Sequence, residues 1–222
     1  MKRVFKSILG FIIIVLLFLY AVDITSYNHG QEINSNINNI LVLVNRKNGL
    51  DKNYIPKDLS IPEIPFSYGV TDEEMHVAGV MKEPLEELIN AAKKEGITLM
   101  GNSGYRSYSS QKILYNNRVR TEGKKSADAY VAKPGFSEHQ TGLCIDITNE
   151  GRYFVEGTVE AEWLEKNCSK FGFIIRYPKY KKDITGIEYE PWHIRYVGKD
   201  VAQYIYENKI TLEEYLECKV RR

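Results

Sequence analysis

This sequence has few cysteines and histidines, and its positive and negative charges almost balance. Its 222 residues include three cysteines and four histidines, and the formal net charge is +1. Cys144, Cys168 and Cys218 form no Cys-x-x-Cys pair, which excludes a zinc knuckle and an obvious disulfide framework. A charge so close to zero gives no reason to expect a nucleic-acid partner. We therefore expect the cysteines to be mainly small, buried residues.

The sequence has one long apolar run, and it lies at the N-terminus. Residues 7–22 are almost wholly apolar and follow Lys2, Arg3 and Lys6. The run is near the short end of the roughly 17–25 residues that cross a bilayer, and the basic residues before it place the N-terminus in the cytoplasm. A cleaved signal peptide is the alternative. We expect a cytoplasmic N-terminus, a transmembrane anchor, an extracellular stalk and one globular domain, at 1–6, 7–22, 23–39 and 40–222.

Helical and extended patterns follow one another irregularly after residue 40. Short apolar or alternating runs predict strands at 40–44, 97–100, 143–148, 173–177 and 188–196. Helical spacing predicts helices at 71–96, with a break near Lys82-Glu83 before Pro84, and at 109–120, 127–132, 159–171, 201–207 and 212–216. No regular βαβ repeat is present. The order predicts an α+β fold, with a small and mostly antiparallel sheet flanked by helices.

Two short motifs carry the candidate chemistry. The first, at 137–146, contains His139 and Asp146, and the second is Glu190-Pro191-Trp192-His193. Alternation along the strand 143–148 turns Asp146 away from the core. Two imidazoles and a carboxylate, with one position open for water, suit a hydrolytic zinc site. We expect His139, Asp146 and His193 to bind one Zn²⁺ per chain, although Fe²⁺, Mn²⁺ or Co²⁺ also fit, and Glu190 to be the general base.

These motifs stand within a longer series of sequence words, at 103–107, 137–146, 172–178, 185–186 and 190–198. In content and order the series resembles the VanY-type D-alanyl-D-alanine carboxypeptidases, zinc peptidases that trim peptidoglycan stem peptides. The likeness covers about residues 40–200. It implies a hedgehog/D-Ala-D-Ala-peptidase-like fold, with His139, Asp146 and His193 as zinc ligands and Glu190 as the catalytic base.

The resemblance also assigns residues to the substrate. Arg106 matches the arginine that contacts it, and a guanidinium can give two charge-assisted bonds to a terminal carboxylate or to an oxyanion. Arg106 is thus expected to act in both catalysis and binding. Ser137 and Gln111 are expected to hydrogen-bond the substrate, while Tyr177 and Trp192 wall the pocket. Two further residues are expected to be structural ion-pair partners, Arg176 and Arg195.

The implied activity is removal of the terminal D-alanine from peptidoglycan stem peptides by metal-activated water. We expect a monomer in the cell membrane, with its catalytic domain on the wall side. L,D-carboxypeptidase action on tetrapeptide stems and D,D-dipeptidase action use the same chemistry. A non-catalytic zinc-bearing wall-binding module is a further alternative. A serine peptidase is another, because Ser109-Ser110-Gln111-Lys112 forms Ser-x-x-Lys, but convincing Ser-x-Asn and Lys-Thr-Gly partners are missing.

One residue departs from the family's pattern, which usually has alanine at position 144. By strand alternation Cys144 shares the face of Asp146, two residues or about 6.6 Å along the strand. We expect it to be an inert packing residue. The alternative is a thiol near enough to the metal to make the enzyme sensitive to oxidation.

Overall fold

A four-stranded antiparallel sheet forms the centre of the fold. The computed structural model describes residues 40–220. The strand order is β3 (Met100–Ser103), β4 (Cys144–Thr148), β6 (His193–Tyr196) and β5 (Phe173–Ile175). A smaller antiparallel pair joins β1 (Leu59–Ser60) to β2 (Val77–Ala78). The expected mixed fold with a small antiparallel sheet is confirmed.

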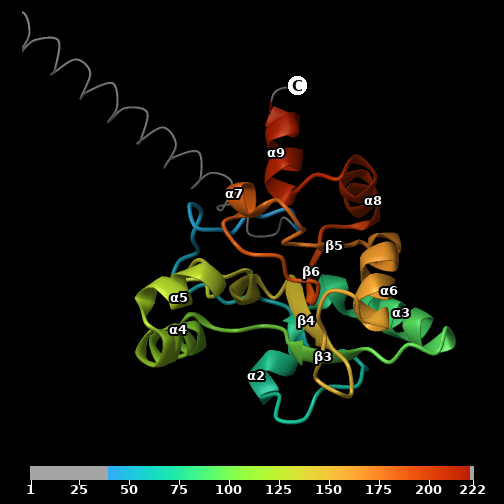
Figure 1. The fold of residues 1–222 in the computed structure, drawn as a ribbon, viewed down its shortest axis with the longest axis horizontal. Helices are drawn as coiled ribbons and strands as arrows, with labels where there is room; N and C mark the ends of the chain where they lie inside the picture. Colours follow the sequence, from blue (N-terminus) through green and yellow to red (C-terminus); the bar gives the residue numbers. More distant parts are fainter. Residues whose placement is uncertain (1–39, 221–222) are drawn as a thin grey trace, which may run out of the picture. The chain divides into compact units, whose positions relative to one another are not determined.

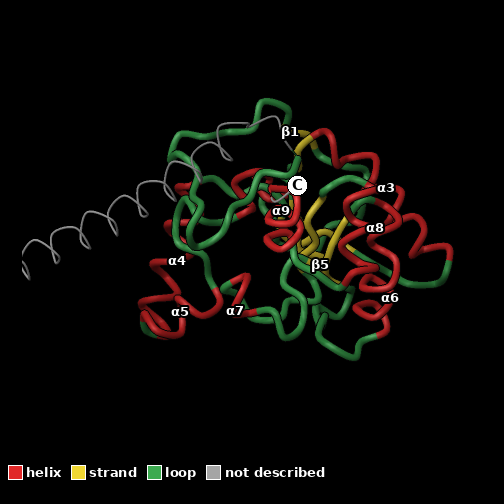
Figure 2. The backbone as a smooth tube through the Cα atoms, turned by 90° about the horizontal axis from the view of Figure 1, so that it is seen from above, coloured by secondary structure: helices red, strands yellow, loops and turns green. Residues whose placement is uncertain are grey.

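Helices flank the larger sheet on both sides. Helices α3 (Gly79–Lys94), α6 (Val159–Asn167) and α8 (Lys199–Asn208) lie to one side of it (Figure 1). Helices α4 (Tyr108–Glu122), α5 (Lys124–Tyr130) and α7 (Lys182–Thr185) lie to the other, as the view from above also shows (Figure 2). The remaining helical segments are α2 (Asp72–Met75), the 3-10 helices η1 (Glu138–Thr141) and η2 (Cys168–Phe171), and α9 (Leu212–Val220).

The core lies on the α3 side of the sheet. Ile145 and Ile147 of β4 and Ile194 of β6 are buried there, in one cluster with the apolar side chains of α3 and α6. Each such side chain contributes about 1.5–3 kcal/mol by its burial. Because side chains alternate along a strand, the opposite face carries Asp146 and His193. The register pairs these two residues directly across β4 and β6, so the core and the candidate site occupy opposite faces of the same strands.

The helix expected at 71–96 is interrupted at a different place from the one expected. Helix α2 is closed at its start by a capping box between Thr71 and Glu74, and the chain then extends through β2 before α3 begins. Pro84 lies inside α3, and no break occurs at Lys82-Glu83. A proline removes only one backbone hydrogen bond, and the buried apolar stripe of α3 holds the helix together around it. The interruption comes instead from the pairing of β2 with β1.

The apolar run at 40–44 forms no strand, so this expectation is wrong. Leu43 and Val44 are nevertheless buried. A continuous apolar run reports that side chains leave water, and it does not by itself require backbone pairing. The other expected strands fall near β3, β4, β5 and β6, and the helices expected after residue 100 are all present with shifted ends.

The described residues include all three cysteines but not the expected membrane anchor. Cys144 and Cys168 are buried, whereas Cys218 is exposed, and all three are free thiols. Within residues 40–220, no helix combines the length and apolar character needed to cross a bilayer. The anchor and stalk expected at 7–22 and 23–39 lie outside the described residues and stay predictions.

Candidate active site

Asp146 and the two motif histidines meet on the face of the sheet opposite the core. Asp146 Oδ1 lies 3.0 Å from His193 Nδ1, and Asp146 Oδ2 lies 3.6 Å from His139 Nε2. The two imidazole rings meet edge to face with their centroids 5.0 Å apart. Side chains from η1, β4 and β6 therefore direct two nitrogens and a carboxylate toward one small space.

His139 reaches this space from η1, and Gly142 allows the chain to turn sharply where η1 ends. Gly142 follows η1 with a φ of +66°, and a Cβ there would lie 3.0 Å from the backbone nitrogen of Ala78. His139 Nδ1 lies 2.7 Å from the carbonyl oxygen of Gly104. A carbonyl only accepts hydrogen bonds, so Nδ1 carries the proton and the lone pair of Nε2 is directed toward Asp146. The backbone thus sets both the place and the tautomer of this imidazole.

The polar atoms of the site fit a bound cation. Asp146 Oδ1 is buried and has no hydrogen-bond partner among residues 40–220. Burial opposes ionisation of Asp146, but the positive charges of His193 and Arg106 help to lower the pKa of the carboxyl to about 2. Burial is also the main reason that the pKa of His139 falls to about 3, so this imidazole is neutral. A carboxylate and a neutral imidazole are the ligand forms that a divalent metal needs.

Cys144 is a further candidate ligand. Its sulfur and one ring nitrogen from each of His139 and His193 lie within 4.8 Å of one another. Burial raises the pKa of the Cys144 thiol, whereas Asp146 is already ionised. Because metals bind the thiolate and not the thiol, Asp146 is the better third ligand.

Glu190 lies next to the histidine of its own motif. Its Oε2 is 3.8 Å from His193 Nδ1, and its side chain is 13% exposed. Burial raises the pKa of Glu190 to about 7, against the opposing effects of His193 and Arg106. A carboxyl group whose pKa lies near neutrality can both accept and donate a proton under physiological conditions.

Arg106 is held in place by two neutral side chains. Its Nη1 donates to Gln111 Oε1 at 2.7 Å, and its Nη2 donates to Ser103 Oγ at 2.8 Å. The amide nitrogen of Gln111 donates in turn to the carbonyl of Ala132 at 2.7 Å. Both polar groups of Gln111 are therefore engaged in orienting Arg106. A direct contact between Gln111 and substrate stays a prediction.

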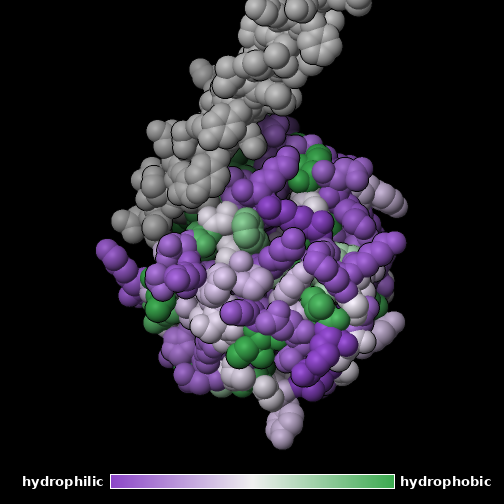
Figure 3. Space-filling model, turned by 90° about the vertical axis from the view of Figure 1, so that its left-hand side faces the viewer, coloured by the Kyte–Doolittle hydropathy of each residue, from purple (hydrophilic) through white to green (hydrophobic). Residues whose placement is uncertain are grey.

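All the expected site residues line one cleft of about 540 Å³, namely Arg106, Gln111, Ser137, His139, Asp146, Tyr177, Glu190, Trp192 and His193. The ring of Tyr177 lies 4.9 Å from that of His193, centroid to centroid. Residues of α4 and α5 form the opposite wall. The side of the molecule that carries α4 and α5 is largely hydrophilic, with small separate apolar patches (Figure 3).

Glu138 is a residue of this region to which the sequence assigns no role. Its side chain is buried, and its Oε1 accepts hydrogen bonds from Arg176 Nε at 2.8 Å and Arg195 Nη1 at 2.6 Å. Burial opposes its ionisation, but the two arginines hold the pKa of Glu138 well below its ordinary value. A signal is present in the sequence, because Arg176 directly follows the apolar run of β5 and Arg195 follows Ile194 in β6. Arginines that are buried at such positions require a buried anion. The expected ion-pair roles of both arginines are confirmed.

Comparison with known proteins gives consistent matches. Residues 74–199 match the family model described as VanY, D-alanyl-D-alanine carboxypeptidase. YodJ of Bacillus subtilis strain 168, provisionally named a carboxypeptidase, is 46% identical over 87% of this chain and 72% of its own length. A D-alanyl-D-alanine carboxypeptidase of Enterococcus faecium is 34% identical over 80% of this chain, and the match spans 57% of that protein.

Solved structures agree with these matches. The structure of the LD-carboxypeptidase LdcB is 47% identical, with a TM-score of 0.77 over 82% of this chain and 87% of LdcB. A mutant of the D,D-pentapeptidase VanY from a VanB-type resistance cassette, in complex with Zn(II), is 36% identical, with a TM-score of 0.68 over 79% of this chain and 98% of that one. Fold and site thus define a peptidase. More narrowly, the chain belongs to the VanY family of D-alanyl-D-alanine carboxypeptidases.

Proposed function

We propose that this chain is a zinc-dependent carboxypeptidase that releases the terminal D-alanine from peptidoglycan stem peptides. The observation that carries the proposal is the convergence of two histidines, one aspartate, one glutamate and one arginine in a single cleft. Asp146 lies 3.0 Å and 3.6 Å from the nearest nitrogens of the two histidines. The Zn(II) in the related VanY structure supports zinc as the metal.

His139, Asp146 and His193 would hold the metal. When bound, Zn²⁺ polarises the scissile carbonyl and makes a bound water acidic at neutral pH. Glu190 takes a proton from the attacking water and delivers it to the departing amine, which its pKa of about 7 suits. Arg106, already oriented by Gln111 and Ser103, binds the C-terminal carboxylate or the developing oxyanion through its paired N–H groups.

Two stem peptides are candidate substrates. The family match and the enterococcal relative favour a pentapeptide stem that ends in D-Ala-D-Ala. The 47% identity to an LD-carboxypeptidase structure favours a tetrapeptide stem, in which an L-centre carries the terminal D-alanine. Both substrates release the same amino acid and need the same metal chemistry. They differ in the residue that precedes the scissile bond.

A competition assay separates the two candidates. The protein is incubated with equal amounts of pentapeptide and tetrapeptide stems, and mass spectrometry follows the loss of one D-alanine from each. Faster consumption of the pentapeptide supports D,D-carboxypeptidase action, and faster consumption of the tetrapeptide supports L,D action. Zinc-loaded protein that cleaves neither stem would exclude both candidates. Cleavage of free D-Ala-D-Ala by that protein would then indicate a dipeptidase, and no cleavage would indicate a binding module.

We further propose that residues 7–22 anchor the protein in the cell membrane and place the catalytic domain on the wall side. The apolar run behind Lys2, Arg3 and Lys6 supports this orientation. Fractionation of cells that express the full chain, followed by protease treatment of intact protoplasts, tests the location. Membrane-bound protein that external protease degrades agrees with the proposal. Recovery of a shortened chain from the medium would indicate a cleaved signal peptide instead.

A further inference from the structure

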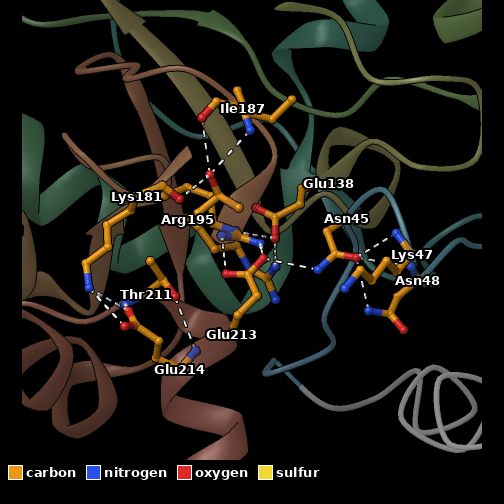
Figure 4. A network of polar contacts seen from close by, with 12 residues as sticks. Asn45, Lys47, Asn48, Glu138, Lys181, Ile187, Arg195, Thr211, Glu213 and Glu214 are labelled. Atoms are coloured by element: carbon orange, nitrogen blue, oxygen red, sulfur yellow. Dashed lines mark hydrogen bonds and ion pairs between the residues drawn. The ribbon is translucent and has the colours of Figure 1, made fainter. Parts of the chain in front are cut away.

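A buried ion network lies beside the candidate metal site, on the same face of the sheet as His193. Glu138 is at its centre, beside Arg195, with Glu213 of α9 nearby (Figure 4). Arg176 bridges the two carboxylates, because its Nε donates to Glu138 and its Nη1 and Nη2 donate to Glu213 at 2.9 Å and 2.7 Å. Glu213 and Asn45, which donates to Glu213 at 3.1 Å, both lie outside the segment that matches the family model.

The network uses only one oxygen of Glu138. Both arginines donate to Oε1. Oε2 is buried and has no hydrogen-bond partner among residues 40–220, and the same is true of His193 Nε2. These two atoms face each other across 3.8 Å, about 0.8 Å more than an N–H···O bond. A buried acceptor and a buried potential donor thus stand side by side, each without the partner that burial ordinarily requires.

This arrangement bears on which nitrogen of His193 can bind a metal. The other nitrogen, Nδ1, lies 3.0 Å from Asp146 Oδ1 and would have to offer a lone pair to a cation bound at the proposed site. A neutral imidazole has one N–H, so Nδ1 is free only when Nε2 carries the proton. A carboxylate at Nε2 selects that tautomer. For His139 the Gly104 carbonyl does the same at the opposite ring nitrogen.

We propose that Glu138 is the positioning residue of the metal site. Its Oε2 accepts a hydrogen bond from Nε2–H of His193 in the metal-bound protein, which keeps Nδ1 unprotonated and directed at the metal. Arg176 and Arg195 hold the carboxylate in place by its other oxygen. The inference rests on the proposed metal site, and it adds a residue whose effect on the metal passes through His193.

Glu138→Gln tests the proposal because the arginines dictate how the new amide lies. Both arginines are donors, so the amide oxygen takes the place of Oε1 and the NH₂ group takes the place of Oε2. A donor then faces His193 Nε2 and favours the tautomer with the proton on Nδ1. We expect the zinc affinity of the full chain, titrated in detergent against a chromogenic chelator, to fall about 10- to 100-fold. The ring ¹⁵N shifts of His193, recorded in the metal-free protein at a pH high enough to leave the ring neutral, should report the change of tautomer.

Glu213→Gln is the matched control. It removes the same charge from the same buried network, but Glu213 hydrogen-bonds with Arg176 and Asn45, and among the described residues no hydrogen bond joins Glu213 to His193. We expect it to lower the melting temperature while zinc affinity stays within about threefold of wild type and the His193 tautomer is unchanged. An equal loss of zinc affinity in both variants would overturn the proposal, because the effect would then follow from destabilisation alone.

A second variant keeps the test decisive if Glu138→Gln does not fold. Glu138→Asp preserves the negative charge between the arginines but shortens the side chain by one C–C bond, about 1.5 Å. It should fold and still lose zinc affinity, because the oxygen cannot span the network and reach His193. Folded Glu138→Asp protein with wild-type zinc affinity and tautomer would overturn the inference. Failure of the wild-type chain to bind zinc would instead overturn the proposed function, and the inference with it.

Discussion

Replacing Glu190 by glutamine should reveal how much the burial of this ionised carboxylate lowers the free energy of unfolding. In the metal-free protein, burial raises the pKa of Glu190 from 4.5 to about 7. The native state therefore binds more protons than the unfolded state between these two values. The contribution of Glu190 to the free energy of unfolding is therefore fully present below pH 4.5 and is lost as the pH rises through 7. A shift of about 2.5 units at about 1.4 kcal/mol per unit gives about 3 kcal/mol.

Denaturant unfolding of chelated protein at pH 5 and pH 8 measures this term. We expect Glu190→Gln to match wild type at pH 5 and to be more stable by up to about 3 kcal/mol at pH 8. Glu188→Gln is the control, because Glu188 is an exposed neighbour paired with Lys182 and makes the same change of charge. It should show no comparable dependence on pH. A difference between Glu190→Gln and wild type that is equal at both pH values would refute the reasoning.

The remaining predictions concern binding, folding and the thiol. Arg106→Lys should lower kcat/KM about 10- to 100-fold in steady-state assays, because a lysine cannot replace the paired N–H groups; unchanged kinetics would contradict the assignment. Gly142→Ala should lower stability by about 1–3 kcal/mol in thermal unfolding, because of its positive φ and its contact with Ala78, and a wild-type melting curve would count against this. Cys144→Ala should keep both zinc and turnover, and loss of zinc from that variant would show that the thiol is a ligand.

Glu190→Gln also has a catalytic consequence. Removal of the general base should lower turnover by about 10²- to 10⁴-fold while zinc stays bound. Metal content by atomic absorption and turnover are measured on the same preparation. Loss of zinc together with activity would mean that Glu190 holds the metal and does not only transfer protons.

Local periodicity was sufficient to predict the face of the strand on which Asp146 lies. Alternation along 143–148 directed Ile145 and Ile147 to the core and Asp146 to the opposite face, as the structure has it. The bend at Gly142 was also foreseeable, because it needs a residue that tolerates positive φ. These features depend on only a few consecutive residues, so the sequence alone contains the physical information that determines them.

Features set by tertiary pairing were not foreseeable in the same way. The interruption before α3 depends on β1, which lies far upstream and is only two residues long. The engagement of Gln111 depends on Arg106 and on the Ala132 carbonyl from the end of α5. Glu138 is linked to arginines 38 and 57 residues away. No local pattern specifies such partners, because they are chosen by the packing of whole elements.

The central claim is tested most directly by following D-alanine release before chelation, after chelation and after zinc is returned. The account predicts release from a stem peptide by the untreated protein, loss of release after chelation, recovery with one equivalent of zinc, and no inhibition by a β-lactam. Release that survives chelation and stops with a β-lactam would contradict it and would point to a serine peptidase.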